Sequence, residues 1–154
     1  MCKASLDLDK LEIKGKQHFA RGKWEKAQYV FEQILGIDPQ NLFALNKIGV
    51  IFARKGQPNS AEYYFRKILS IDHTYKTALN NLGNILLERG EIGQAMNCYR
   101  KAIKIDEDYT GAYHNLAVAY KKEGDIDSYI KNIKKSARLK KRERRRNIIR
   151  WRKR

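Results

Sequence analysis

Residues of the same kind recur every 34 positions along most of this chain. The repeated residues are small, aromatic or part of an Ile-Asp pair. In five aligned columns they are Gly22, Gly56, Gly90 and Gly124; Gly15, Gly49, Gly83 and Ala117; Ala27, Ala61 and Ala95; Phe31, Phe65 and Tyr99; and the pairs that begin at Ile37, Ile71 and Ile105. A period of this length is typical of solenoids, in which each copy forms one supersecondary unit and neighbouring copies stack. The sequence therefore predicts a stack of similar units with one continuous core.

Each copy has the pattern of two helices. Apolar residues recur at helical spacing on both sides of the glycine equivalent to Gly90, and each half predicts an amphipathic helix of about 14 residues. Gly90 stands where the first helix must end, a position that commonly requires a left-handed backbone. Gly83 and Ala95 are small enough to let the two helices approach closely, and Tyr99 fills the space that remains. Each copy is therefore predicted to be an antiparallel helix pair.

These columns resemble the tetratricopeptide repeat family, most clearly in the copy ALNNLGNILLERGEIGQAMNCYRKAIKIDEDY at residues 78–109. The resemblance covers residues 8–139. It implies an all-α fold, a right-handed α-solenoid of antiparallel helix pairs that winds into a superhelix with a concave inner surface. We divide the chain into a lead-in at 1–7, repeats at 8–41, 42–75, 76–109 and 110–139, and a basic tail at 140–154.

The fourth copy departs most from the pattern. Tyr129 stands where alanine is expected, and Ile133 replaces the aromatic residue. A terminal repeat has no following neighbour, so its outer face need not accept another helix. We expect its second helix to extend from about residue 127 into the basic tail, with Ile130, Ile133 and Ala137 forming its inner stripe. The oligomeric state stays open, because the bare end of this repeat is a surface on which a second copy of the chain could stack to form a homo-oligomer.

The resemblance implies a peptide-binding groove lined by the first helix of each repeat. Its candidate residues are Lys16; Asn46, Lys47 and Arg54; Asn80, Asn81 and Asn84; and His114, Asn115, Lys121 and Lys122. Asparagine offers both donors and an acceptor, so a row of asparagines can pair with the main chain of an extended peptide. The alternative interpretation is that these are ordinary solvated polar residues.

The lysines and arginine among these positions make the groove more basic than acidic. An extended and somewhat acidic partner segment would suit it, with charge acting mainly on the rate of encounter. The family's clamp for the carboxylates at chaperone C-termini is not expected, because neither register of the repeats supplies its set of lysine, asparagine and arginine residues.

Most of the positive charge lies at the C-terminus. The net charge is +16, and residues 131–154 contribute most of it because Glu143 is their only acid. The candidate contacts to phosphate or another anionic surface are Lys140, Lys141, Arg142, Arg144, Arg145, Arg146, Arg150, Trp151 and Arg152. Three interpretations stay open: binding of RNA or DNA with Trp151 stacking on a base, association with an anionic membrane surface, or a solvated extension that aids solubility or docks on an acidic patch of the same protein.

Catalytic and cofactor chemistry is not predicted. The histidines His18, His73 and His114 share no spacing, no phosphate-binding glycine loop is present, and no nucleophile elbow or paired catalytic carboxylates occur. Cys2 and Cys98 lie far apart and are interpreted as reduced thiols, which favours a cytoplasmic location. No apolar run approaches the roughly 20 residues that a transmembrane helix needs.

The sequence therefore predicts a non-catalytic, cytoplasmic scaffold without cofactor or metal, which binds an extended segment of a protein partner in its groove. The alternative function is a nucleic-acid-associated adaptor that acts through the Arg/Lys-rich tail.

Overall fold

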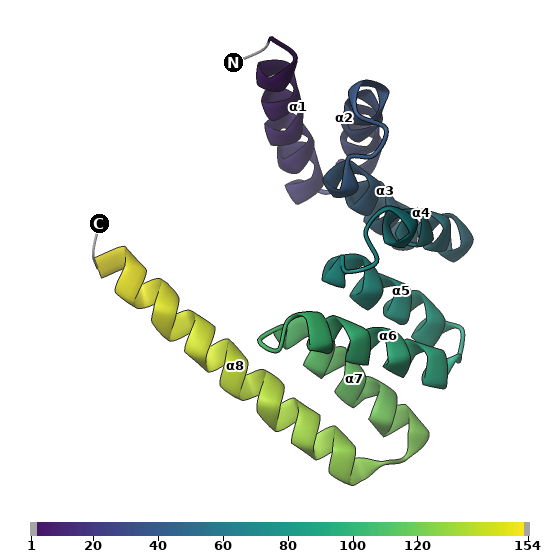
Figure 1. The fold of residues 1–154 in the computed structure, drawn as a ribbon, viewed down its shortest axis with the longest axis vertical. Coiled ribbons are helices and arrows are strands. Elements are labelled where there is room, and N and C mark those ends of the chain that lie inside the picture. The colour runs from purple at the N-terminus through teal and green to yellow at the C-terminus, as the bar shows by residue number, and fades with distance from the viewer. Residues whose placement is uncertain (1–2, 153–154) are drawn as a thin grey trace. The chain divides into compact units, whose positions relative to one another are not determined.

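The computed structural model describes the backbone of residues 3–152 and the side chains of residues 7–148. This part of the chain is all-α and has no strand (Figure 1). Its helices are α1 (Lys3–Ala20), α2 (Trp24–Ile37), α3 (Leu42–Arg54), α4 (Pro58–Ile71), α5 (Lys76–Glu88), α6 (Ile92–Ile105), α7 (Thr110–Glu123) and α8 (Ile126–Arg152). Each first helix packs against the helix that follows it, which gives the predicted helix pairs.

The chain divides into two compact units. Residues 1–73 hold α1 to α4, and residues 74–154 hold α5 to α8. Within the first unit α2 packs against α3, and within the second α6 packs against α7, so that consecutive pairs share a core. The core of the first unit includes Ala27, Phe31, Ile34, Ala44, Ile48 and Ile51. Ala95, Met96, Tyr99, Ala102, Ala112 and Leu116 are buried in the second.

A left-handed glycine ends the first helix of every pair, as predicted. The φ angles are 67° at Gly22, 71° at Gly56, 83° at Gly90 and 88° at Gly124. Other residues rarely adopt such angles because their Cβ atom clashes with the backbone. The chain reverses at these glycines, and the second helix of each pair begins two residues later.

The second glycine column makes room for the aromatic ring. A Cβ atom built on Gly83 would lie only 2.5 Å from Cε1 of Tyr99, well inside van der Waals contact. The same close approach joins Gly15 to Phe31 and Gly49 to Phe65. All three rings are buried. The prediction that these glycines let the paired helices come together is confirmed.

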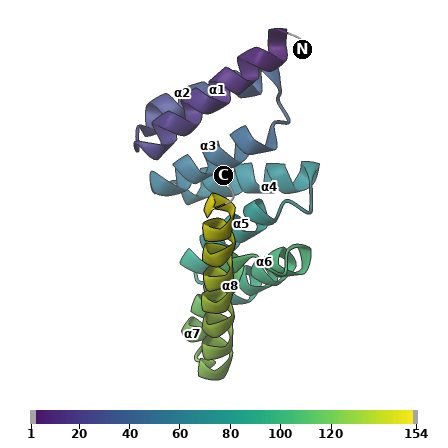
Figure 2. The same cartoon turned by 90° about the vertical axis from the view of Figure 1, so that its left-hand side faces the viewer.

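The last helix is one continuous element of 27 residues that crosses the predicted boundary between repeat and tail. It lies beside α7 and continues beyond it (Figures 1 and 2). Its extension into the basic tail was predicted.

The predicted inner stripe of α8 was wrong in its register. Ile130 is 41% exposed and Ala137 is also exposed, whereas Ser136 and Leu139 are buried. Ser136 keeps the packing face of the repeat, because it follows Ala102, a core residue of α6, by 34 positions. Ile130 follows the buried Met96 by the same interval, but in the described part of the chain α8 has no further helix packed on that side, as α6 has α7. Ile130 and Ala137 lie on a neighbouring face of the helix.

Candidate functional site

Three asparagines and a tyrosine join α5, α6 and α7 in the second unit. The side-chain NH2 group of Asn115 donates hydrogen bonds to the Oδ1 atoms of both Asn80 and Asn84, each at 2.9 Å. The hydroxyl group of Tyr99 donates to Asn84 Oδ1, also at 2.9 Å. Burial raises the pKa of Tyr99 well above its usual range, so this hydroxyl stays protonated and remains a donor. We call these four residues the amide cluster.

The local sequence explains this geometry. Asn80 and Asn84 are four residues apart, so they lie on the same face of α5. Asn115 follows Asn80 by 35 positions, one repeat plus one residue, which turns it toward that face from α7. Both protons of the Asn115 amide and both lone pairs of Asn84 Oδ1 are used inside the cluster. The hydrogen bonds of the cluster do not involve the Asn84 NH2 group or the Asn115 carbonyl oxygen.

The other predicted groove residues of the second unit fall into two groups. Asn81 is half-buried and makes polar interactions within the protein. His114, Lys121 and Lys122 are exposed on α7, and the ammonium group of Lys121 lies 5.6 Å from the ring centroid of Tyr129. The second unit therefore combines a fixed group of amides between α5 and α7 with exposed basic side chains on α7, of which Lys121 contacts α8.

In the first unit, the predicted lysines lie on aromatic rings. The Nζ atom of Lys47 is 4.5 Å from the ring centroid of Phe19 and 5.3 Å from that of Phe43. Lys16 Nζ lies 4.5 Å from the Phe43 centroid. Burial, with a smaller effect from Lys16, lowers the pKa of Lys47. Contacts between a cation and a ring hold the two lysine head groups together on the α1–α3 face.

Arg54 extends this arrangement. Its guanidinium carbon is 5.3 Å from the ring of Trp24, which packs edge-on against Phe19. The remaining predicted residue, Asn46, is buried and engaged within the protein, as Asn80 is one repeat later. Sequence reasoning missed the rings of Phe19, Trp24 and Phe43. The available signal was helical spacing between a ring and a basic residue: Phe19 follows Lys16 by three positions, and Lys47 follows Phe43 by four.

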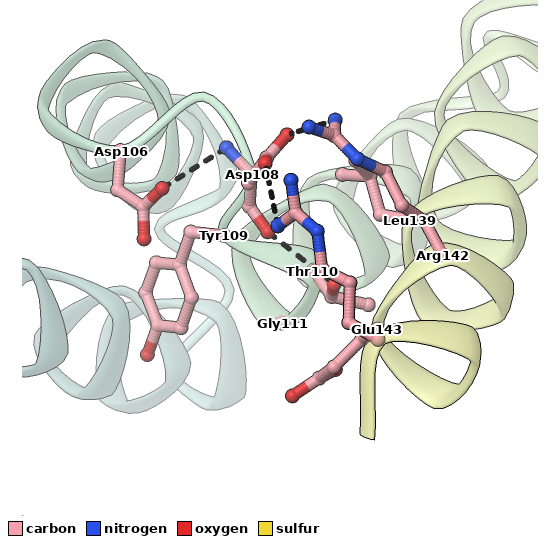
Figure 3. Close-up of a pocket in the computed structure, with 9 residues that line it drawn as sticks. Asp106, Asp108, Tyr109, Thr110, Gly111, Leu139, Arg142 and Glu143 are labelled. Carbon is pink, nitrogen blue, oxygen red and sulfur yellow. Dashed lines mark hydrogen bonds and ion pairs between the residues drawn. The ribbon is translucent and has the colours of Figure 1, made fainter. Parts of the chain in front are cut away.

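The basic C-terminal helix makes ion pairs with the loop before α7. Arg142 donates to Asp108 Oδ1 at 3.2 Å, and Arg146 Nη1 lies 3.7 Å from Asp108 Oδ2 (Figure 3). Between this loop and α8 lies a cavity of about 420 Å³, into which Leu139 and Glu143 also project. These contacts match the interpretation in which part of the tail docks on acidic groups of the same protein.

The other tail candidates remain at the surface. Lys140, Lys141, Arg144 and Arg145 are exposed. The side chains of Arg150, Trp151 and Arg152 lie outside those that the structure describes.

Two family models match the second half of the chain. The model described as TPR repeat matches residues 83–124, and the model described as tetratricopeptide repeat matches residues 110–143. The left-handed glycines and the glycine–ring contacts extend the same pattern to the first unit. This chain is a tetratricopeptide repeat protein. No curated protein sequence matches it at a significant level.

Solved structures similar to this tetratricopeptide repeat protein share its fold. The crystal structure of MamA is 27% identical, with a TM-score of 0.69, over 82% of this chain and 74% of MamA. PilF from Pseudomonas aeruginosa is 25% identical, with a TM-score of 0.81, over 90% of this chain and 63% of PilF. An O-GlcNAc transferase from Thermobaculum terrenum is 22% identical, with a TM-score of 0.73, over 78% of this chain but only 23% of the transferase, which shows similarity of fold alone.

The tetratricopeptide fold supports a general role as a scaffold for protein–protein interaction. In the described part of the chain, no helix has the length and apolar character needed to cross a bilayer. The same residues contain no group of three or more histidines, cysteines or acids placed to hold a metal ion.

Proposed function

We propose that this protein holds an extended segment of a partner protein against the α5–α7 face of its second unit. The amide cluster supports this proposal, because its hydrogen bonds fix Asn84 and Asn115 in place without involving the Asn84 NH2 donor or the Asn115 carbonyl acceptor. A peptide backbone offers the complementary acceptor and donor. Because the cluster is already ordered, little side-chain entropy is lost when the peptide binds.

Basic side chains in each of the two units favour an acidic segment. Lys121 and Lys122 are exposed at the end of α7, and Lys47 and Arg54 give the α1–α3 face of the first unit the same sign of charge, whereas Lys16 is paired with Glu12 at 2.7 Å. Exposed charges act mainly on the association rate, and their effect weakens with salt. Hydrogen bonding to the backbone is then expected to determine how long the partner stays bound.

The substitution Asn84→Asp tests the role of the cluster. A carboxylate oxygen can still accept the bonds from Tyr99 and Asn115, but the NH2 donors are lost. Uncharged peptides selected from a random display library should bind this variant at least about tenfold more weakly, as expected for a well-placed interface residue. Fluorescence polarisation gives the affinity, and uncharged peptides remove the effect of the added negative charge.

Asn97→Asp is the matched control, because Asn97 is an exposed asparagine on α6, away from the cluster. The control variant should bind the selected peptides as the wild-type protein does, and both variants should melt within a few degrees of it. Equal peptide affinity for all three proteins would rule out the amide cluster as the binding element.

A nucleic-acid adaptor is the second candidate function. The observation that favours it is the exposure of Lys140, Lys141, Arg144 and Arg145 on the distal half of α8, where Glu143 is the only acid. Such a surface neutralises phosphates without reading bases, so binding should be tolerant of sequence and sensitive to salt.

A further inference from the structure

The outer side of the fourth repeat carries an apolar strip on α8. Ile126 is 53% exposed and Ile130 is 41% exposed, and Ala137, seven residues after Ile130, is exposed as well. These residues and Lys134 lie on one side of the helix, because they follow one another at intervals of four, four and three residues. We call Ile126, Ile130, Lys134 and Ala137 the end face.

The preceding repeat shows what such a face does in this protein. On α6, Met96 is only 3% exposed, and Arg100 donates a hydrogen bond to the hydroxyl group of Tyr120 on α7 at 2.9 Å. Ile130 and Lys134 follow these two residues of α6 by 34 positions. The end face therefore has an aliphatic side chain, Ile130, and a cation, Lys134, at the positions equivalent to Met96 and Arg100. In the preceding repeat, this part of α6 packs against α7.

The helix that α6 accepts has a simple pattern. The α7 residues Ala112, Leu116 and Ala119 are buried and lie at positions i, i+4 and i+7. Three spaced apolar anchors of this kind are typical of a helix that binds in a groove. The end face should thus accept a helix with small or aliphatic residues at i, i+4 and i+7.

A second copy of the chain does not present such a helix at its other end. The residues of α1 equivalent to Ala112, Leu116 and Ala119 are Lys10, Lys14 and Gln17, all of them exposed. Placing them on the end face would bury two lysines against isoleucine and beside Lys134, and burial of unpaired charge is costly. Head-to-tail stacking of two copies is therefore disfavoured.

Contact between two end faces is disfavoured by charge. Residues 126–148 of α8 contain ten lysines and arginines but only two acids, Asp127 and Glu143. Two such helices side by side would repel each other, whereas a helix with acidic flanks would be attracted to the same surface.

We propose that the end face binds an amphipathic helix of a different, acidic protein. The helix carries small or aliphatic residues at i, i+4 and i+7 against Ile126, Ile130 and Ala137. An acidic side chain beside this stripe pairs with Lys134, in the place where Tyr120 pairs with Arg100. This binding surface is separate from the amide cluster, so a partner could occupy each of them independently.

The test uses two stapled helical peptides with the same Ala, Leu, Ala stripe at i, i+4 and i+7. One has glutamate at its remaining surface positions, and its twin has lysine there. Fluorescence polarisation against the full chain should show binding of the glutamate peptide, weakening with salt, and no binding of the lysine twin. Ile130→Asp should weaken binding of the glutamate peptide by at least about tenfold. Because Ile130 is a surface residue, the variant should keep the wild-type circular dichroism spectrum.

A matched pair of charge reversals locates the site on the helix. Lys134→Glu should weaken binding more than Lys131→Glu, because both change the net charge equally but only Lys134 lies on the end face. Ala137→Glu provides an independent test of the apolar strip, and Asn84→Asp should leave binding of the helical peptide unchanged. Equal binding of the two peptide twins, or insensitivity to both Ile130→Asp and Ala137→Glu, would overturn the proposal. So would a wild-type dimer in sedimentation equilibrium that Ile130→Asp dissociates, because the occupant would then be a second copy.

Discussion

At the scale of single residues, a glycine and an aromatic ring act as one packing element. The ring of Phe31, Phe65 or Tyr99 occupies the space that a Cβ atom would need on the partner glycine. The fourth repeat has Ala117 and Ile133 at the equivalent positions. The fourth repeat therefore has a larger residue, Ala117, where the other repeats have glycine, and a smaller one, Ile133, where they have an aromatic ring. The two changes compensate in volume, as expected in a close-packed interior.

Gly83→Ala tests this pairing. The added methyl group would collide with the buried ring of Tyr99, so we expect the free energy of unfolding to fall by about 1–3 kcal/mol, the usual cost of overpacking. Urea denaturation followed by circular dichroism measures it.

The control is Gly93→Ala on α6, where nothing lies within 4 Å of the new Cβ atom. This change should stabilise the protein by about 0.5–1 kcal/mol through helix propensity. Adding Tyr99→Ile to Gly83→Ala recreates the alanine–isoleucine pair of the fourth repeat, and the double substitution should cost less than the sum of the single ones. Additive costs would mean that the ring and the glycine are not coupled.

At the scale of secondary structure, α8 depends on contacts at several points along its length. Its first half packs on α7 through Ser136, whose hydroxyl group donates to the carbonyl oxygen of Thr110 at 3.2 Å, and through Leu139. Beyond Leu139, the described side chains that contact the rest of the unit include Arg142 and Arg146, both paired with Asp108. The distal half is thus held by exposed ion pairs, which are weak individually.

Asp108→Asn should loosen the distal half of α8 without unfolding the unit. Losing the carboxylate charge weakens both ion pairs, and exposed pairs of this kind contribute about 0–1 kcal/mol. We expect amide hydrogen exchange to quicken by up to about fivefold in residues 140–148, with the exchange of α7 unchanged. Exchange followed by mass spectrometry provides the measurement. Glu107→Gln is the matched control in the same loop, and similar exchange in the two variants would show that Asp108 has no special role.

At the scale of the whole molecule, the hydrogen-bonding amide cluster and the basic tail lie on different helices. The amide cluster lies between α5 and α7, and the exposed basic residues of the tail lie on α8. The peptide-binding proposal uses the first surface and the nucleic-acid alternative uses the second. Because they share no residue, substitutions can separate them.

Reversing the charge of Lys140, Lys141, Arg144 and Arg145 to glutamate separates the two functions. If the tail binds phosphates, the wild-type protein should bind polyuridylate, with log K falling against log salt by about 0.7 for each phosphate neutralised. The fourfold variant should lose this binding and its retention on heparin, while its affinity for the uncharged library peptides stays within about twofold. No polyuridylate binding by the wild-type protein, even at low salt, would exclude the adaptor.

Much of this protein is decided by short stretches of its sequence. Gly90 and its equivalents need a left-handed backbone, and Gly83 meets Tyr99 only 16 residues later, so the helix pairs follow from local pattern alone. The basic and asparagine-rich character of the first helices could also be read directly.

What only the tertiary structure decided is which of these side chains meet. Asn115 bonds to Asn80 and Asn84 because of the stagger between α5 and α7, and Asp108 meets Arg142 because α8 folds back along α7. The orientation of Ile130 follows from the rotation of α8 about its axis, which is set by the packing of Tyr129, Ile133, Ser136 and Leu139 together. Spacing within one helix limits such a rotation but does not determine it, because several faces of α8 carry apolar residues and only contact with α7 selects among them.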